Sequence, residues 1–286
     1  MQFGFIGLGN MGGGLARNLV RAGKEVLLFD LSKEAIEKVQ AVGSTGKAAA
    51  SINDLAGVDV LFTSLPLPTH LEKVMLGDTG LLNRMKAGAT YIDVSTIDPA
   101  SARKLSDAAA AKGIAFLECP LGKNPAAAEK GEEPIFVGGE KKDYEKMKAI
   151  LAIVGNPIYY MGTVEASAAF KLISNLIGMT NVAVIAEGFR LGEKAGIEPK
   201  LLLELLQDTG AKSFQLDLRG AWIAEGDFAN RFGLDLALKD VRLGCEMATA
   251  WGLQVKLMET ALDYFKQASS AGFGAEDCNA VYKIIQ

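Results

Sequence analysis

The most informative motif of the chain is Gly7-Leu8-Gly9-Asn10-Met11-Gly12. It follows a short apolar run at residues 3–7 and leads into residues 12–22, whose apolar positions recur at helical spacing. In such a strand–turn–helix unit, the first glycine permits a tight turn, the second lets a pyrophosphate approach the backbone, and the third lets helix and strand pack closely. The helix N-terminus favours the anion. We therefore predict a dinucleotide site at Gly7, Gly9, Asn10, Met11 and Gly12, the alternative being a glycine-rich turn without a ligand.

Asp30 ends the next apolar run, residues 25–30. A carboxylate at this place accepts hydrogen bonds from both ribose hydroxyls of NAD and repels the 2′-phosphate of NADP. The following Leu31-Ser32-Lys33 lacks the arginine that commonly meets that phosphate. We predict NAD as the cofactor; the alternative is an aspartate that only caps a turn.

Apolar runs and helical patterns alternate through the first half of the chain. This order predicts a doubly wound parallel sheet with helices on both faces, a Rossmann α/β fold. The expected strands are residues 3–7, 25–30, 58–64, 89–94, 115–118, 135–138 and 158–160. The expected helices are residues 12–22, 33–42, 70–75, 99–112 and 142–153.

The second half has no convincing strand. Residues 165–194 form one long apolar helical pattern, and residues 201–207, 214–223, 235–250 and 257–269 follow as helices. We therefore expect two domains, a dinucleotide-binding Rossmann domain at 1–162 and an all-helical substrate and oligomerisation domain at 163–286, joined by the long helix.

Composition narrows the class of protein. Of the 286 residues, 49% are hydrophobic and 22% are charged, which is typical of a folded globular protein with hydrophobic cores. The net charge of −4 and the lack of a basic stripe argue against nucleic acid. Three scattered cysteines give neither metal spacing nor a disulfide framework.

The uncharged stretch 172–186 is shorter than the roughly 20 residues of a spanning helix and is expected to be a buried helix. We expect a cytoplasmic protein without a membrane segment or a metal.

Two hydroxyls follow an expected strand at Asp93-Val94-Ser95-Thr96. The carboxyl edge of a parallel sheet is where α/β proteins bind ligands, so Ser95 and Thr96 are candidate ligand residues. The alternative is that this segment only starts a helix, with Asp98 as its N-cap and Pro99 in its first turn. That alternative does not account for the hydroxyls of Ser95 and Thr96.

Lys171 and Asn175 share one face of the long apolar helix, because they are four residues apart. A lysine among Phe170, Leu172 and Ile173 is expensive to bury unless it has a partner or a task. The alternative is a lysine whose ammonium reaches the surface. His70, the only histidine, precedes a charged helix, so a lysine is the better candidate proton carrier.

Three motifs together resemble the β-hydroxyacid dehydrogenases, which include 3-hydroxyisobutyrate dehydrogenase and tartronate semialdehyde reductase. The motifs are residues 4–12, Asp93-Val94-Ser95-Thr96 and Lys171-Leu172-Ile173-Ser174-Asn175, and the likeness extends to residues 238–240 and 272–277. The resemblance covers essentially the whole chain. A 6-phosphogluconate dehydrogenase has a much larger helical domain, so the chain is too short for that activity.

The resemblance implies a site and an assembly. It implies that Lys171 is the catalytic lysine and that Asn175, Ser95 and Thr96 hold substrate. It implies that Lys239 reaches the cofactor or substrate as a cleft closes, and that Leu65 and Thr96 line the NAD site with Met11 and Asp30. Homodimers or homotetramers are usual in the family.

One loop departs from the family pattern. Pro120-Leu121-Gly122-Lys123-Asn124-Pro125 stands where Pro-Val-Ser-Gly-Gly is usual, and the loop continues Glu129-Lys130-Gly131-Glu132-Glu133-Pro134 instead of the usual Gly-Thr-Leu. A basic residue here is similar to sulfolactaldehyde reductases. We predict that Gly122, Lys123 and Asn124 bind the acidic end of a small anionic substrate, with backbone N–H groups near Gly122 and Asn124 supplying donors.

The leading hypothesis is therefore an NAD-dependent reductase of sulfolactaldehyde or a similar small acid aldehyde. The alternative substrates are 3-hydroxyisobutyrate, succinic semialdehyde, and tartronate semialdehyde or glyoxylate. Two other classes are an imine reductase and a non-catalytic NAD-binding module. Lys171 argues against the first, and Lys171 with Asn175 argues against the second.

Overall fold

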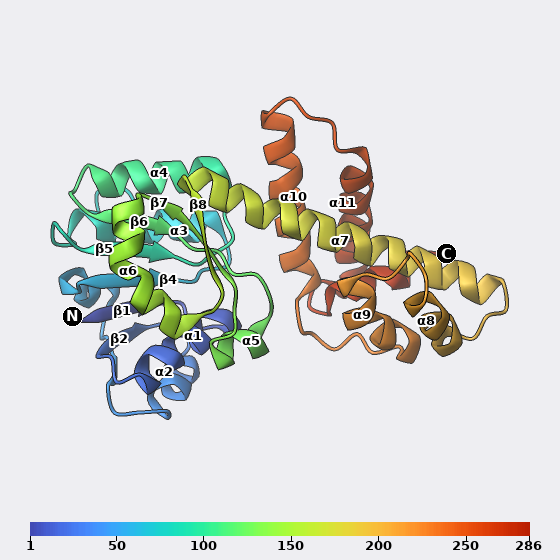
Figure 1. Ribbon diagram of the computed structural model, residues 1–286, viewed down its shortest axis with the longest axis horizontal. Coiled ribbons are helices and arrows are strands. Elements are labelled where there is room, and N and C mark those ends of the chain that lie inside the picture. Colours follow the sequence, from blue (N-terminus) through green and yellow to red (C-terminus); the bar gives the residue numbers. More distant parts are fainter. The chain divides into compact units, whose positions relative to one another are not determined.

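The computed structural model describes all 286 residues, which divide into two compact units, Met1–Lys171 and Leu172–Gln286. The first unit is α/β and the second is helical (Figure 1). The expected boundary at residue 162 coincides with the end of the last strand, whereas packing carries the first unit on into the long helix α7 (Val164–Lys194). Val164 and Ala168 explain this extension, because both are buried in the core of the first unit.

One eight-stranded sheet organises the first unit, in the order β3-β2-β1-β4-β5-β6-β7-β8. The chain reverses its direction of winding between β1 and β4, so the ligand crevice is expected at the carboxyl ends of these two strands. The strands are β1 (Phe3–Ile6), β2 (Val26–Phe29), β3 (Gly46–Ala48), β4 (Val60–Thr63), β5 (Thr90–Asp93), β6 (Ala115–Glu118), β7 (Ile135–Gly139) and β8 (Ile158–Gly162).

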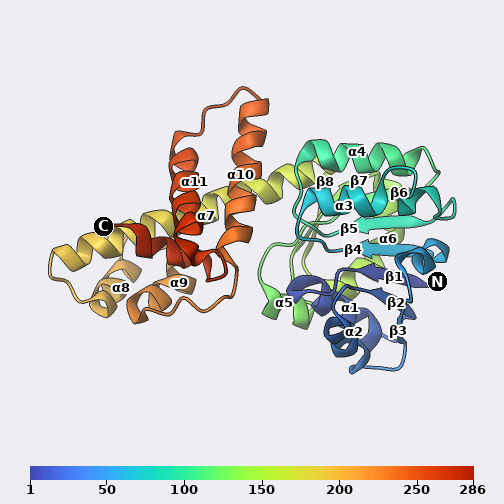
Figure 2. The same ribbon diagram turned by 180° about the vertical axis from the view of Figure 1, so that it is seen from behind.

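Helices cover both faces of this sheet, as the alternating pattern predicts (Figure 2). One core holds α1 (Asn10–Arg21), α2 (Lys33–Gln40) and α6 (Lys141–Val154) against the sheet. The other holds α3 (Pro68–Met75), α4 (Pro99–Ala110) and the first turns of α7. The four residues of β1, β4 and β5 are all buried, which is typical of strands covered on both faces.

The second unit continues α7 and adds α8 (Pro199–Gln207), α9 (Phe214–Glu225), α10 (Leu234–Ala250) and α11 (Lys256–Ala268). Short helical turns follow at Ser269–Phe273 and Cys278–Ile284. A buried ion pair between Arg219 Nε and Asp277 Oδ1, 2.9 Å apart, ties the C-terminal turn to α9. Asp277 Oδ2 also accepts the Phe232 N–H at 2.8 Å, so this buried carboxylate is well satisfied.

The sequence-based prediction was wrong at two places in the sheet. The pairing of β6 with β7 is antiparallel rather than parallel. The prediction also missed the three-residue strand β3, which is too short to show a pattern. The remaining predicted strands and helices are present with shifted ends.

A further helix lies in the stretch expected to be a loop. This helix, α5 (Pro125–Lys130), begins with the Asn124 side chain accepting the Ala127 N–H at 3.1 Å. It ends at Gly131, whose φ of 69° is the left-handed conformation that glycine adopts readily. Asparagine, proline at the first helical position and a closing glycine are ordinary helix signals.

The expectation that residues 172–186 are buried holds for only one side of α7. Ile177 is 50% exposed and Val184 is 58% exposed, whereas Val182 and Ala186 are fully buried. By length and composition α7 could cross a membrane, and 39% of its most apolar 18-residue window is buried. The core of the second unit covers one stripe of the helix and leaves the other apolar side open.

Candidate active site

A cavity of about 600 Å³ opens at the glycine-rich turn of the first unit. It contains Gly9, Asn10 and Asp30, three of the residues predicted to bind a cofactor. Its other lining residues are Leu8, Arg17, Ser32, Glu34, Ala35, Lys38, Pro125, Ala126 and Glu129. The cavity therefore lies between the β1–α1 turn, the end of β2 and α5, the helix that was not predicted.

The three glycines of the turn have three different environments. Gly7 has a φ of 89°, and a Cβ there would lie 2.2 Å from the Ser64 carbonyl oxygen. A Cβ on Gly12 would lie 2.1 Å from the Gly7 carbonyl oxygen. A Cβ on Gly9 would meet no atom within 4 Å. Gly7 and Gly12 are thus required by the fold, whereas Gly9 keeps open space beside the N-terminus of α1, where a pyrophosphate fits.

Asp30 braces the same turn. Its Oδ2 accepts the Leu8 N–H at 2.6 Å, and its Oδ1 accepts the Ser32 N–H at 2.8 Å. A carboxylate has about four acceptor positions, so these two bonds leave capacity for ribose hydroxyls. The residues fit a dinucleotide: Gly9 and the α1 N-terminus for the pyrophosphate, and Asp30 for the ribose.

The cavity also contains an ionic cluster that the sequence analysis missed. Arg17 Nε donates to Glu129 Oε2 at 2.8 Å, and Arg21 pairs with the other oxygen of Glu129. The hydrogen bond from Arg17 is the main cause that lowers the pKa of Glu129 below its usual value. The cluster joins α1 to α5, and nothing in the spacing of residues 17 and 129 indicates it.

A hydrogen bond joins Ser95 to Leu65. Ser95 Oγ accepts the Leu65 N–H at 2.9 Å and donates to Asp93 Oδ1 at 2.7 Å. Thr63 Oγ1 donates to the same Asp93 oxygen. Since Ser95 is only 4% exposed, its hydroxyl holds the loops that carry Leu65 and the half-buried Thr96. Met11, also half-buried, packs against the core beneath the turn.

A second acid lies next to this network. Glu118 is paired in register with Asp93 across β5 and β6 and is fully buried. Burial, followed by the charge of Asp93, raises the pKa of Glu118 well above its usual range. Neither of its carboxyl oxygens has a hydrogen-bond partner. Burial also raises the pKa of the adjacent Cys119 thiol, in keeping with a packing role for that cysteine.

Lys171 is carried by a firmly anchored stretch of α7. One turn earlier, the Ser167 hydroxyl donates to the Phe136 carbonyl oxygen at 2.7 Å. The neighbouring Phe170 ring packs on the Phe136 ring, with centroids 4.4 Å apart. Lys171 itself is half-buried. The anchoring fixes where the base of its side chain lies relative to the sheet.

The turn predicted to bind the substrate anion uses its backbone donors internally. The Gly122 N–H bonds to the Pro134 carbonyl oxygen at 3.0 Å, and the Lys123 N–H donates to a carboxylate oxygen of Glu133. The Asn124 side chain caps α5. The expectation that backbone groups near Gly122 are available to a ligand is therefore wrong for this conformation. Lys123 is exposed and its Nζ lies 3.3 Å from the Glu132 carbonyl oxygen.

Glu133 belongs to the segment that departs from the family pattern. It is fully buried, and its Oε2 has no hydrogen-bond partner. Burial raises the pKa of Glu133, while the Lys123 N–H and the charge of Lys171 act in the opposite direction. This carboxylate holds the 122–124 turn through the Lys123 N–H.

In the second unit, Asp240 joins two predicted site residues. Asn175 Nδ2 donates to Asp240 Oδ2 at 2.7 Å, and Lys239 Nζ lies 2.8 Å from Asp240 Oδ1. Lys239 and Asp240 are both buried. The Asn175–Asp240 bond joins α7 to α10, which sequence spacing does not reveal, whereas Lys239 and Asp240 are neighbours on α10.

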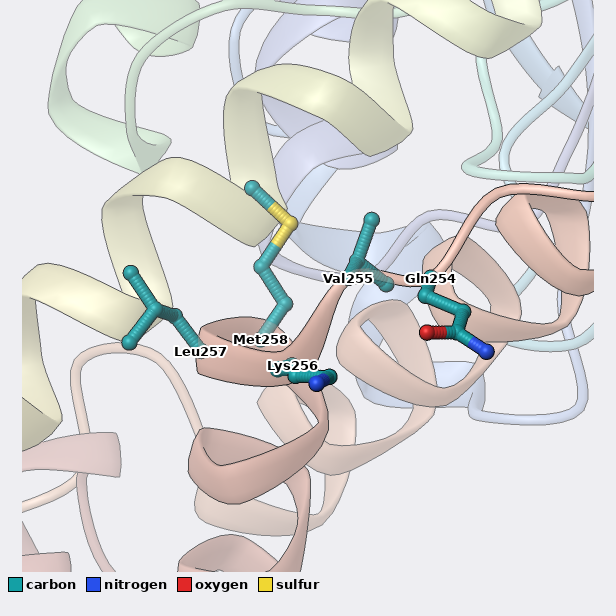
Figure 3. A pocket seen from close by; sticks show the side chains of 5 residues that line it. All are labelled: Gln254, Val255, Lys256, Leu257 and Met258. Atoms are coloured by element: carbon teal, nitrogen blue, oxygen red, sulfur yellow. The ribbon is translucent and has the colours of Figure 1, made fainter.

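Another cavity, of about 400 Å³, lies at the start of α11 (Figure 3). It is lined by one five-residue segment, Gln254, Val255, Lys256, Leu257 and Met258. None of the predicted site residues lines it, so we do not assign it to the chemistry.

Known protein families account for both halves of the chain. Residues 2–162 match the NAD binding domain of 6-phosphogluconate dehydrogenase. Residues 166–285 match the family described as the NAD-binding domain of NADP-dependent 3-hydroxyisobutyrate dehydrogenase. The two matches meet close to the predicted boundary at residue 162.

Individual relatives align over nearly the full length. The chain is 34% identical to 2-(hydroxymethyl)glutarate dehydrogenase of Eubacterium barkeri, over 99% of this chain and 94% of that protein. It is 31% identical to an NAD-dependent L-serine dehydrogenase of Pseudomonas aeruginosa, over 99% and 97%. The crystal structure of a 3-hydroxyisobutyrate dehydrogenase from Salmonella typhimurium superposes with a TM-score of 0.90 at 31% identity, covering 100% of both chains.

Proposed function

Because the chain belongs to the β-hydroxyacid dehydrogenase family, we propose that it interconverts a small acidic semialdehyde and its hydroxy acid, with Lys171 as the acid and base. Family membership makes it an oxidoreductase that uses a nicotinamide dinucleotide. The observation that carries the assignment of the lysine is its position on the anchored first turns of α7, one turn after Ser167.

We assign cofactor binding to the glycine-rich turn and Asp30. The bound nicotinamide supplies or accepts the hydride. Gly9 leaves room for the pyrophosphate, and Asp30 offers its remaining acceptor positions to the ribose hydroxyls. Because Asp30 is a carboxylate, it disfavours a 2′-phosphate, so NAD is the proposed cofactor rather than NADP.

Lys171 handles the proton. During reduction its ammonium group donates a proton to the carbonyl oxygen, and during oxidation the neutral amine accepts the hydroxyl proton. Ser95 holds the loop that carries Leu65 and Thr96. Asn175 is held by Asp240 and is proposed to orient the substrate, and Lys239 to assist at the cofactor or substrate.

For the substrate we propose a small aldehyde that carries a sulfonate or carboxylate, with sulfolactaldehyde as the first candidate. The support is the exposed cation Lys123, which stands in the turn where the family usually has small donors. The named relatives act on other hydroxy acids: 2-(hydroxymethyl)glutarate, L-serine and 3-hydroxyisobutyrate. The alternatives to be tested are 3-hydroxyisobutyrate, succinic semialdehyde, and tartronate semialdehyde or glyoxylate.

A screen of NADH oxidation tests the proposal. The aldehydes are sulfolactaldehyde, succinic semialdehyde, tartronate semialdehyde, methylmalonate semialdehyde and glyoxylate, each assayed with NADH and with NADPH. We expect the highest kcat/KM with an acidic aldehyde, and a preference for NADH of roughly tenfold or more. Turnover of imines but of no aldehyde would support the imine reductase instead, and NADH binding without any turnover would support a non-catalytic module.

The open side of α7 supports a homo-oligomer. Ile177, Val184 and Leu191 are 50%, 58% and 72% exposed along this helix. Exposed apolar surface of this kind marks protein interfaces, and a second copy of the chain is the proposed partner. Light scattering on the purified protein is expected to give the mass of a dimer or tetramer.

We place the enzyme in the cytoplasm, with no nucleic acid or membrane partner.

A further inference from the structure

We propose that Arg17 is a further cofactor-binding residue, whose guanidinium donates to the pyrophosphate of the dinucleotide, and that Glu129 is its positioning residue. The proposal rests on the proposed function, in which the dinucleotide occupies the cavity at the glycine-rich turn. It adds a cation from the second turn of α1 to the backbone N–H groups at the N-terminus of that helix.

The position of the Arg17 guanidinium carries the proposal. Arg17 lines the same cavity as Gly9 and Asn10. Side chains of an α-helix lean towards its N-terminus, and the side chain of Arg17 does so here, because its Nη1 would lie only 3.2 Å from a Cβ on Gly13. The guanidinium therefore lies beside the first turn of α1, at the end of the helix that favours a phosphate.

The ionic cluster around Glu129 has an excess of positive charge. Arg17 and Arg21 both pair with this one carboxylate, so two cations share one anion. Lys38, the other cation of the cavity lining, pairs with Glu34 at 2.7 Å, and its side chain is 65% exposed. The side chain of Arg17 is only 20% exposed, so solvent screens its charge less. Arg17 is therefore the cation of this cavity that is best suited to a bound phosphate.

Arg17 also has hydrogen-bond donors left for a ligand. Its Nε donates to Glu129 Oε2 at 2.8 Å, and its Nη2 donates to the same oxygen. A guanidinium carries five N–H donors in one plane, so this contact uses two of the five. The remaining donors include both N–H groups of Nη1, the nitrogen next to Gly13. A planar pair of donors matches two oxygens of a phosphate.

Glu129 is itself held against α1, because α5 packs closely on that helix (Figure 2). A Cβ on Gly14 would lie 3.0 Å from the backbone nitrogen of Glu129. The Asn18 side chain also donates from Nδ2 to the Ala128 carbonyl oxygen at 2.8 Å. Glu129 thus holds the Arg17 side chain in one place before a ligand binds, which lowers the entropy lost on binding.

Fluorescence titration with NADH tests the inference on the purified full-length protein. Arg17→Met should raise the Kd for NADH by roughly tenfold to a hundredfold, because a charge-assisted hydrogen bond is lost. Arg17→Lys keeps the charge but not the planar pair of donors, so its Kd should be intermediate. The matched control is Arg21→Met, because Arg21 pairs with the same carboxylate but does not line the cavity. Its Kd should stay close to that of the wild type.

Fragments of the cofactor locate the contact. ADP-ribose contains the pyrophosphate and adenosine lacks it. Arg17→Met should therefore raise the Kd of ADP-ribose by the same factor as that of NADH and leave the Kd of adenosine unchanged, both measured by displacement of NADH. Binding of NADPH should weaken as much as binding of NADH. A loss confined to NADPH would overturn the assignment, because it would place Arg17 at the 2′-phosphate.

Glu129→Gln separates contact with the cofactor from mere support of α5. This variant breaks the ion pair but keeps the cation of Arg17, so it should raise the Kd for NADH by a smaller factor than Arg17→Met does. Equal losses in the two variants, or a wild-type Kd in a folded Arg17→Met protein, would overturn the inference and leave the proposed function intact. If the wild-type protein binds neither NADH nor ADP-ribose, the proposed function fails as well.

Discussion

Asn175 donates a hydrogen bond of 2.7 Å from Nδ2 to Oδ2 of Asp240, and the other oxygen of that carboxylate lies 2.8 Å from Nζ of Lys239. One buried acid therefore orients two residues that the family resemblance assigns to the site. Removing a single partner of a buried ion pair leaves an uncompensated charge, which is strongly destabilising.

Asp240→Ala should therefore lower the free energy of unfolding by about 3–5 kcal/mol, because the buried Lys239 ammonium and the Asn175 amide both lose this carboxylate. Urea denaturation measures the change, with exposed Glu246→Ala on the same helix as the control. The double variant Lys239→Met/Asp240→Leu should regain most of the stability but little activity. A stable Asp240→Ala variant with normal KM would show that Asp240 does not orient Asn175 and Lys239 for the reaction.

The glycine-rich turn predicts a separation of folding from cofactor binding. Gly9→Ala adds a methyl group where no protein atom lies within 4 Å, so the thermal midpoint should stay within a few degrees of wild type. The methyl group should obstruct the pyrophosphate and raise the Kd for NADH at least tenfold. Gly12→Ala, by contrast, should destabilise the fold, since its Cβ would lie 2.1 Å from the Gly7 carbonyl oxygen. Calorimetry and fluorescence titration measure the two effects, and unaltered NADH binding by Gly9→Ala would place the dinucleotide elsewhere.

Lys123 tests the charge of the substrate. If its ammonium binds the acid group, Lys123→Ala should raise KM for an acidic aldehyde by roughly tenfold to a hundredfold, since a charge-assisted hydrogen bond is worth about 1.5–3 kcal/mol. Turnover of an uncharged aldehyde should barely change. The exposed Lys130→Ala serves as the matched control. Equal small effects on both aldehydes would remove Lys123 from the substrate site and the sulfonate proposal with it.

Glu118 predicts a pH dependence of stability. Its pKa is higher in the folded protein than in the unfolded chain, chiefly through burial, so its protonated form is favoured by folding. The stability it contributes is present below the unfolded pKa and is lost as pH rises through the folded pKa. Glu118→Gln mimics the protonated acid and should escape that loss. Its stability relative to wild type should be at least about 1 kcal/mol more favourable at pH 8 than at pH 5. A pH-independent difference, measured by urea unfolding, would contradict a protonated Glu118.

Most of the fold could be predicted because local patterns carry it. The Gly7–Gly12 turn, the run of buried strands and the uninterrupted helix after Gly162 each fix structure within a few residues of chain. The antiparallel β6–β7 pair could not be predicted, because strand direction depends on contacts between distant residues. Helix α5 could have been predicted, because Asn124 and Pro125 are ordinary signals of a helix start and Gly131 of a helix end.

Motifs in the sequence single out candidate residues but not the contacts between them. Gly9 and Asp30 were both candidates and line one cavity, whereas the role of Lys171 stays a prediction. Other contacts near the candidate residues join distant parts of the chain: Arg17 donates to Glu129, and the Lys123 N–H donates to the Glu133 carboxylate. Such pairs depend on tertiary packing, which a single sequence does not reveal.

The most direct test of the central claim is the turnover number of Lys171→Met with its preferred aldehyde, measured alongside NADH binding. If Lys171 is the proton donor, kcat should fall by about 10²–10⁴-fold while the Kd for NADH stays unchanged. Methionine is close to lysine in length and apolar, so the anchored turn at Ser167 should remain folded. Near-wild-type turnover by a folded Lys171→Met enzyme would contradict the account.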